Sequence, residues 1–379
     1  MNKILFITYS FGFSSPVGAG AERVVKALAR LGTFVYVITS SVYKGRIDNV
    51  KIITRQNAPR IPARFTEAFS NFTGREVGHI IWEIKAFRSA RKILKRDPGI
   101  VAVYTRSLPI SVCPIGIKIK KQYHLPLMMH FTDPIPAPIE WAPNNESRVR
   151  MIRQMKDYIP NADLISFGNR HMLQYEERTL GVSLSEKAFI SQDPSAYQFI
   201  TLPAREEGDS SVRLVFLGNI YGNRNPAHLF EAISNVNDKK NITLNLYGNN
   251  KGSFPSFVIN RNRTNDILAV MKNADILVDI DGDDKDPVFI SSKLRDYLSV
   301  NRPVLAISPK DSPSREVLEG LKTVQISSNN TAEIQEAILR LLKMEFSESD
   351  YKERIPIVSS FNPDNIAREI IQHINAIVK

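Results

Sequence analysis

Short apolar runs alternate with amphipathic segments in the first half of the chain. The run 3–10 (KILFITYS) is almost continuously apolar, which is typical of a strand that is buried on both faces of a sheet. After a glycine-bearing loop, the segment 21–32 (AERVVKALARLG) places its valines and leucines on one helical face. Another apolar run follows at 33–40. This strand–loop–helix–strand order predicts the start of a parallel α/β sheet.

The same alternation continues to residue 192 and then stops. The stretch from Gln192 to Ser211 is polar, contains proline and shows little periodicity, so we interpret it as an interdomain linker. Before this stretch, further strands are predicted at 100–107, 125–131, 162–169 and 187–192, and helices at 147–159 and 171–181.

After the linker the pattern begins again with a strand, a glycine-bearing loop and a helix. We therefore expect an α/β protein with two Rossmann-like domains, at 1–192 and 193–360, and a C-terminal helix at 361–379 that can pack back on the first domain. Ligands in such sheets bind beyond the carboxyl ends of the strands, so both domains would turn their loops toward a shared cleft. The second-domain elements are predicted at 213–219, 227–236, 242–248, 274–280 and 303–308.

Length and composition agree with an ordinary globular protein of two domains. A chain of 379 residues exceeds the size at which a single core usually keeps growing. The single cysteine, Cys113, excludes an intramolecular disulfide and suits a reducing compartment. A buried strand explains the segment 4–13 better than a signal peptide does, and no apolar run reaches the ~20 residues of a membrane span. We expect a cytoplasmic protein.

The formal net charge of +11 is unevenly distributed. Residues 44–97 contain 13 basic and 5 acidic side chains. Such a basic stretch attracts anionic partners: nucleic acid, anionic lipid or a phosphorylated substrate. A solvated helix face explains the same charges equally well.

Two glycine-bearing loops are candidates for binding an anionic ligand. In the first loop, Gly18, Ala19 and Gly20 precede a helix, where small residues let a ligand approach the helix N-terminus; packing explains such glycines equally well. In the second loop, 218–226 (GNIYGNRNP), Arg224 can contact two phosphate oxygens at once. The alternative for Arg224 is a surface arginine beside an acidic side chain.

The segment 286–308 (DPVFISSKLRDYLSVNRPVLAIS) is the third candidate. Ser291 and Ser292 can offer hydroxyls and amides at a helix start, but Lys293 at the same end is unfavourable for the helix dipole. A bound phosphate would compensate this cation. One turn further on, Asp296 can accept two ribose hydroxyls. The alternative is an amphipathic helix whose polar face includes both charges.

Taken together, these segments resemble the retaining glycosyltransferases of family four, which have the GT-B fold. Asp296 precedes Pro303 by seven positions, as the acidic residue of that family precedes the proline of its PVLA-like strand. The segment 291–298 resembles an [ST]-K-L-x-[ED]-Y-L variant of the motif, and 218–226 resembles the phosphate loop. The segment 16–25 (PVGAGAERVV) resembles the glycine-rich loop on the acceptor side. Similarity extends over nearly the whole chain.

The resemblance implies transfer of a sugar from a nucleotide-diphosphate sugar to a glycan or lipid-linked acceptor, with retention of configuration, in cell-surface polysaccharide synthesis. Arg224 and Lys293 would neutralise the leaving diphosphate, and one of His130 and Asp133 would face the sugar. No metal would be required, and the basic stretch 44–97 would face an anionic membrane on its inner side. Donor-binding residues would be Gly218, Asn219, Gly222, Ser291, Ser292 and Asp296.

One feature of the chain departs from the pattern of that family, and another could indicate a different function. Many members have two glutamates eight positions apart, whereas here the first position is Val288, which leaves the donor sugar open. The acidic run 279–286 (DIDGDDKD) has Gly282 at its fourth position and Ile290 at its twelfth, so it fails as an EF-hand, and we interpret it as a solvated loop. Alternatives are a sugar-nucleotide 2-epimerase of the same fold and a non-catalytic nucleotide- or nucleic-acid-binding module, for which no signature is present.

Overall fold

The computed structural model describes residues 2–13, 15–56, 77–141, 145–205, 211–237 and 240–378. The chain forms two compact units. Unit 1 consists of Met1–Pro194 together with Pro363–Lys379, and unit 2 consists of Ser195–Asn362. Among the described residues, no helix is both long enough and apolar enough to cross a membrane.

Unit 1 is built on a parallel sheet of seven strands in the order β3-β2-β1-β4-β5-β6-β7, counted over its described residues. The strands are β1 (Lys3–Thr8), β2 (Phe34–Thr39), β3 (Val50–Thr54), β4 (Ile100–Ser107), β5 (Leu127–Phe131), β6 (Leu164–Phe167) and β7 (Ala188–Ile190). The helices are α1 (Pro16–Arg30), α3 (Val77–Arg96), α4 (Val112–Tyr123), α5 (Asn145–Tyr158), α6 (Arg170–Leu180) and α14 (Pro363–Ile377), with the 3₁₀ turn η1 (Ile159–Asn161).

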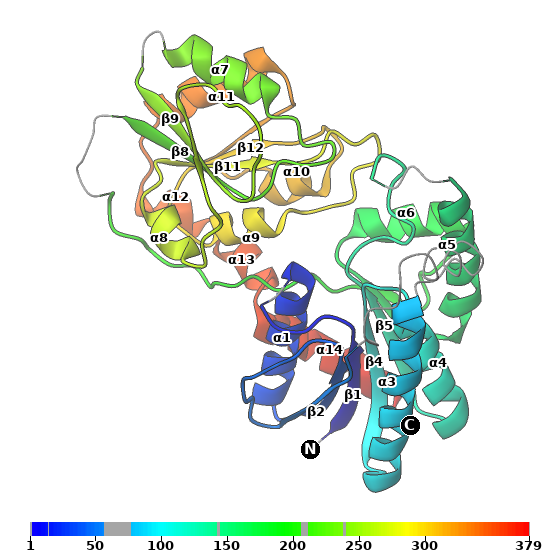
Figure 1. Ribbon diagram of the computed structural model, residues 1–379. Coiled ribbons are helices and arrows are strands. Elements are labelled where there is room, and N and C mark those ends of the chain that lie inside the picture. Colours follow the sequence, from blue (N-terminus) through cyan, green and yellow to red (C-terminus); the bar gives the residue numbers. More distant parts are fainter. Residues whose placement is uncertain are drawn as a thin grey trace. The chain divides into compact units, whose positions relative to one another are not determined.

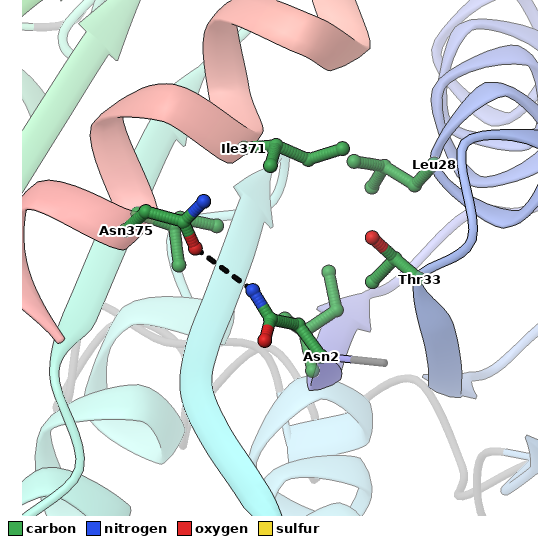
Figure 2. Close-up of a pocket in the computed structure, with 7 residues that line it drawn as sticks. Asn2, Leu28, Thr33, Ile371 and Asn375 are labelled. Carbon is green, nitrogen blue, oxygen red and sulfur yellow. Dashed lines mark hydrogen bonds between the residues drawn. The ribbon is translucent and has the colours of Figure 1, made fainter.

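The core of unit 1 joins the two ends of the sequence. Helix α14 lies against α1 (Figure 1), and Ile366, Ile370 and Ile374 belong to the same buried cluster as Val24 and Leu28. At the amino end of β1, a small cavity of about 10 Å³ lies between these helices. Figure 2 shows the hydrogen bond beside it, from Asn2 to Asn375. This cavity lies away from the carboxyl ends of the strands.

Unit 2 repeats the arrangement with a six-stranded parallel sheet in the order β10-β9-β8-β11-β12-β13, again over its described residues. The strands are β8 (Val212–Leu217), β9 (Ile242–Tyr247), β10 (Val258–Arg261), β11 (Ile276–Ile280), β12 (Val304–Ile307) and β13 (Val324–Ser327). The helices are α7 (Ala227–Asn237), α8 (Ile267–Lys272), α9 (Ser292–Leu298), α10 (Pro313–Leu318), α11 (Thr331–Lys343), α12 (Glu348–Lys352) and α13 (Ile355–Ser360).

Both sheets change direction at the same place in their strand order. In unit 1 the chain builds outward from β1 to β3 and then returns to start again at β4, which pairs with β1. In unit 2 the corresponding neighbours are β8 and β11. At such a switch point the loops after the two adjacent strands diverge and leave a crevice, which is where ligands bind in open α/β sheets.

The predicted α/β class with two Rossmann-like parallel sheets is confirmed, with local differences. Helix α1 begins at Pro16 rather than near residue 21, because Ser15 caps it and proline suits the first helical position. The edge strands β3, β10 and β13 were not predicted, and neither were the helices α3, α4, α8, α10, α11, α12 and α13. The chain passes between the units at Pro194–Ser195, and residues 206–210 of the predicted linker lie outside the described residues.

A buried arginine ties the last helices of unit 2 to its sheet. Arg354 is fully buried, and burial lowers its pKa to about 10. Its guanidinium donates to the backbone carbonyls of Val300 and Arg302 at 2.9 Å and to both oxygens of Thr323, at 2.8 and 2.9 Å. These acceptors lie beside the strands β12 and β13, so Arg354 satisfies carbonyls that have no access to water.

We expect Arg354→Met to destabilise unit 2 by about 3 kcal/mol or more, because several buried carbonyls lose their donor at about 1–3 kcal/mol each. Urea unfolding measures this. The matched control is Arg340→Met, which removes an exposed arginine paired with Glu336 and is expected to cost less than about 0.5 kcal/mol. Equal effects of the two substitutions would contradict the anchoring role.

Candidate functional site

The loop after β8 in unit 2 is held against the loop after β9. Asn219 Oδ1 accepts from the backbone N–H of Asn249 at 2.8 Å, and Asn250 Oδ1 accepts from that of Ile220 at 2.7 Å. A Cβ on Gly248 would overlap the carbonyl oxygen of Gly218, so only glycine fits there. The predicted donor-binding Asn219 therefore uses its side-chain oxygen to hold the loop.

Two glycines shape the turn that presents Arg224. Gly218 has φ +154° and Gly222 has φ +60°, the left-handed region that glycine occupies without strain. The Arg224 guanidinium lies 5.0 Å from the centre of the Tyr221 ring and is half-buried. Its Nε is buried and has no hydrogen-bond partner within the described part of the chain.

The predicted helix start at Ser291–Lys293 is confirmed. Ser291 is the N-cap of α9, and its Oγ accepts from the backbone N–H groups of Lys293 at 3.2 Å and Leu294 at 3.4 Å. Ser292 is the first residue of the helix. Because Ser291 occupies these two N–H groups, the lysine ammonium is the group at this helix start that is best suited to bind an anion.

The cation at this helix start has an internal counter-charge. Lys293 Nζ lies 3.8 Å from Asp296 Oδ2. The other oxygen of Asp296 accepts from the hydroxyl of Ser195 and the backbone N–H of Ala196, both at 3.4 Å. Asp296 is buried, and each of these partners is another residue of the protein itself. Its predicted role as a ribose ligand stays a prediction.

The interpretation of 279–286 as a solvated loop is wrong for its most important members. Asp279 is 3% exposed and lies inside β11, and Asp284 is 7% exposed. Asp284 accepts from the Asn223 side chain at 2.8 Å, and Asp281 accepts from the Ser308 hydroxyl at 2.6 Å. Among the described residues, no group of three histidine, cysteine, aspartate or glutamate side chains is placed to hold a metal ion.

In unit 1 the predicted glycine loop is instead the beginning of a helix. Gly18, Ala19 and Gly20 lie in the first turns of α1 and are buried. A Cβ on Gly18 would lie 2.6 Å from the carbonyl oxygen of Gly12, and one on Gly20 would lie 3.2 Å from Arg106 Nη2. Close packing within unit 1 therefore accounts for both glycines, while their binding role stays a prediction.

A row of buried polar residues crosses the unit 1 sheet at the carboxyl ends of its strands. Arg106 on β4 is in register with His130 on β5, which is in register with Ser166 on β6. His130 Nδ1 lies 2.9 Å from Ser166 Oγ, and its Nε2 lies 3.8 Å from Asp193 Oδ1. Burial, and then the charge of Arg106, lower the pKa of His130 to about 4, so this imidazole is neutral at pH 7.

The sequence did not single out Arg106 or Asp193. Arg106 is 1% exposed and forms an ion pair with Asp193 just after β7. An arginine at the end of a strand that begins with an apolar run, IVAVYTRS, was a usable signal, because lone arginines are seldom buried without a partner. No local signal could have identified that partner 87 residues away.

The loop after β5 contains the other unit 1 candidate, Asp133, which is half-buried. Two residues on, the backbone N–H of Ile135 donates to Glu176 Oε1 on α6. Glu176 is fully buried, and its Oε2 has no partner within the described residues. Desolvation raises the pKa of Glu176 to about 8, against the lowering effects of the Ile135 amide and the Arg148 charge. Glu176 therefore fixes the loop mainly as a neutral acid.

Comparisons with known proteins bear on the arrangement as a whole. No protein-family model and no curated protein sequence matches the chain. Solved structures do match over the full length. A glycosyltransferase from Rickettsia africae has a TM-score of 0.67 at 12% identity, with 100% of this chain and 99% of that chain covered. Anabaena HepE in complex with UDP-glucose has a TM-score of 0.68 at 12% identity, with 99% and 100% covered.

A third match is WaaG, described as a glycosyltransferase involved in lipopolysaccharide biosynthesis, with a TM-score of 0.66 at 12% identity and coverage of 98% of this chain and 99% of that chain. The fold is GT-B. At this level of identity the comparison shows the fold alone, so the activity has to be argued from the residues. In this GT-B chain, the candidate residues of unit 2 flank the β8–β11 switch point, and those of unit 1 lie at the ends of β1, β4 and β5.

Glu176 gives a pH-dependent prediction. Because its folded pKa of about 8 lies above the ordinary 4.5, the stability associated with its protonation is fully present below about pH 4.5 and is lost as the pH rises toward 8. We expect Glu176→Gln, which stays neutral, to be more stable than wild type at pH 8 by on the order of 2–4 kcal/mol, with the gain vanishing at low pH.

Urea unfolding of both proteins across this pH range measures the effect. The control is Glu186→Gln, which removes an exposed carboxylate from the loop after α6 and should follow the wild-type pH profile. A stability difference between Glu176→Gln and wild type that does not vary with pH would rule out a neutral Glu176.

Proposed function

We propose that the chain is a glycosyltransferase that moves a sugar from a nucleotide-diphosphate sugar to a glycan or lipid-linked acceptor, with retention of configuration. One observation carries this proposal: Arg224 lies in the loop after β8 and Lys293 at the start of α9 after β11, so the two cations follow the two strands that meet at the switch point of unit 2. A diphosphate is the ligand that two such cations suit best. Unit 2 is then the donor domain and unit 1 the acceptor domain.

Each candidate residue has its own role in the proposed sugar transfer. Arg224 and Lys293 neutralise the charge that develops on the diphosphate as the bond to the sugar breaks. Lys293 exchanges its contact with Asp296 for the phosphate, and Asp296 is then available to the ribose. One of His130 and Asp133 of unit 1 faces the sugar, and Ser166 fixes the His130 ring through Nδ1.

The neighbours support the choice of ligand class. HepE was solved with UDP-glucose, and WaaG is involved in lipopolysaccharide biosynthesis. We therefore propose a nucleotide sugar as co-substrate and cell-surface polysaccharide synthesis as the setting. UDP-glucose is the first probe to test, followed by the diphosphates and sugar conjugates of the other bases.

An anionic membrane surface is the partner we propose for the basic part of unit 1. One side of α3 exposes five basic residues, and the only acidic residue of α3, Glu83, is buried and bonded to Lys118. A positive helix face of this kind binds anionic lipid and would bring the protein to lipid-linked acceptors. Residues 57–76 of the basic stretch lie outside the described residues. The basic face of α3 consists of Arg88, Arg91, Lys92, Lys95 and Arg96.

Nucleotide binding tests the proposed donor site. A ligand at ~100 times its dissociation constant should stabilise the folded protein by about 2.7 kcal/mol. We expect at least one nucleoside diphosphate or its sugar conjugate to produce such a thermal shift in wild type. Lys293→Ala removes a charged hydrogen bond to phosphate and should weaken binding roughly 10- to 100-fold.

Lys343→Ala is the control, because this exposed lysine at the end of α11 lies away from the switch point. It should bind as wild type does. A folded wild-type protein that no nucleotide stabilises would refute the proposal. Conversion of the sugar nucleotide to its 2-epimer without an acceptor would indicate the epimerase instead.

Binding to lipid vesicles tests the membrane partner. We expect the wild-type protein to sediment with vesicles that contain anionic lipid and not with zwitterionic vesicles. Each basic residue contributes about 1 kcal/mol near such a surface, so Arg91→Ala, Lys92→Ala and Lys95→Ala together should weaken binding roughly 100-fold. High salt should have the same effect. Equal binding to both kinds of vesicle would exclude an electrostatic surface.

A further inference from the structure

The loop after β8, which bears Arg224, is fastened at two places. At its start, two asparagine side chains join it to the loop after β9. Further on, the Asn223 side chain donates to Asp284 Oδ1 at 2.8 Å, and the carbonyl oxygen of Asn223 accepts from the backbone N–H of Asp283 at 3.3 Å. This second attachment joins the loop after β8 to the loop after β11, the two loops that follow the strands of the switch point.

The second attachment lies in the turn that presents Arg224. Residues 221–224 form this turn, which the backbone N–H of Arg224 closes by donating to the carbonyl oxygen of Tyr221 at 3.2 Å. Asn223 is the third residue of the turn, so its two hydrogen bonds fix the backbone directly before Arg224. The guanidinium lies over the Tyr221 ring, and its Nε has no hydrogen-bond partner within the described residues. The turn therefore holds a cation whose donors are not all in use.

Asp284 has two opposite effects on an anion bound in this place. It is 7% exposed and lies in the loop that connects β11 to α9, which carries Lys293. The negative charge of Asp284 by itself opposes the binding of a diphosphate. Its Oδ1, however, is the acceptor that fixes Asn223 and hence the turn of Arg224. A carboxylate oxygen is a stronger acceptor than a neutral one.

We propose that Asp284 is a positioning residue for the nucleotide-diphosphate donor: it fixes Asn223, and thereby holds Arg224 in the orientation that binds the diphosphate. This inference rests on the proposed function. Groups that are already in place bind an anion more tightly, because little further ordering is needed when the ligand arrives. The positioning effect of Asp284 exceeds the repulsion by its charge, so removing this acidic side chain weakens the binding of an anion.

Isothermal titration calorimetry with UDP and UDP-glucose tests the sign of the effect. Asp284→Ala removes the charge and the acceptor, and the dissociation constant should rise roughly 3- to 10-fold, as for the loss of one hydrogen bond. Asp284→Asn removes the charge but keeps an oxygen for Asn223, and should bind at least as tightly as wild type. Thermal unfolding confirms that each variant is folded at the temperature of the titration.

Arg224→Ala distinguishes positioning from direct contact with the donor. In a protein that already has Arg224→Ala, the further change Asp284→Ala should weaken UDP binding no more, because the group that Asp284 positions is missing. If the two effects on the binding free energy add, Asp284 acts on the nucleotide itself and the positioning role is wrong.

Exchange of the two partners tests the hydrogen bond itself. Asn223→Asp places two carboxylates at a contact of 2.8 Å and should weaken UDP binding at least as much as Asp284→Ala does. Adding Asp284→Asn restores one donor and one acceptor at the net charge of wild type, and should recover most of the lost affinity. The control is Asp283→Ala, which removes an exposed carboxylate from the same loop, keeps its backbone N–H and should not weaken binding.

The outcomes separate this inference from the function on which it rests. A folded wild-type protein that binds no nucleotide refutes both. Binding of UDP by wild type together with equal or tighter binding by Asp284→Ala leaves the proposed transferase intact and overturns the positioning role. If Asp284→Ala does not fold, the exchanged pair decides: failure to recover the affinity lost in Asn223→Asp also overturns that role.

Discussion

The constraint on which the rest of the structure depends is the parallel pairing of strands that are buried on both faces. Strands such as β1 and β11 have few polar positions, so chemistry can be placed only where a strand ends. At most of these ends, neighbouring loops pack against one another. The strand order reverses between β1 and β4 and between β8 and β11, and the candidate residues of each unit lie on the strands, loops and helix starts next to these two places.

In unit 2, gathering charged residues at one place has a cost, which is the desolvation of buried carboxylates. Asp279, Asp281 and Asp284 share the neighbourhood of Arg224, and each is buried or half-buried. Hydroxyl and amide groups from Ser308 and Asn223 offset part of the desolvation of these carboxylates. Unit 1 differs, because Arg106 there has a dedicated partner in Asp193 and the adjacent His130 is neutral.

The elements of the sheets could be predicted from the sequence because their signals are local. Apolar runs located the strands around both switch points. Ser291 indicated the start of α9, because serine is a preferred N-cap residue. The sequence could not reveal what depends on distant neighbours. Asp279 looked like part of a solvated run, because its burial within β11 depends on elements that are distant in the sequence. Gly18 looked like a loop residue, since its close approach to Gly12 is not visible in the pattern.

The position of α14 has a consequence for how the protein is made. Its isoleucines Ile366, Ile370 and Ile374 complete the core of unit 1, although they follow the whole of unit 2 in the sequence. A ribosome therefore releases every residue of unit 2 before it releases the helix that closes unit 1. Until then, the apolar surface of α1 that faces α14 stays uncovered, and unit 2 is free to finish folding first. Truncation of the last helix would accordingly damage the first-synthesised unit and spare the second.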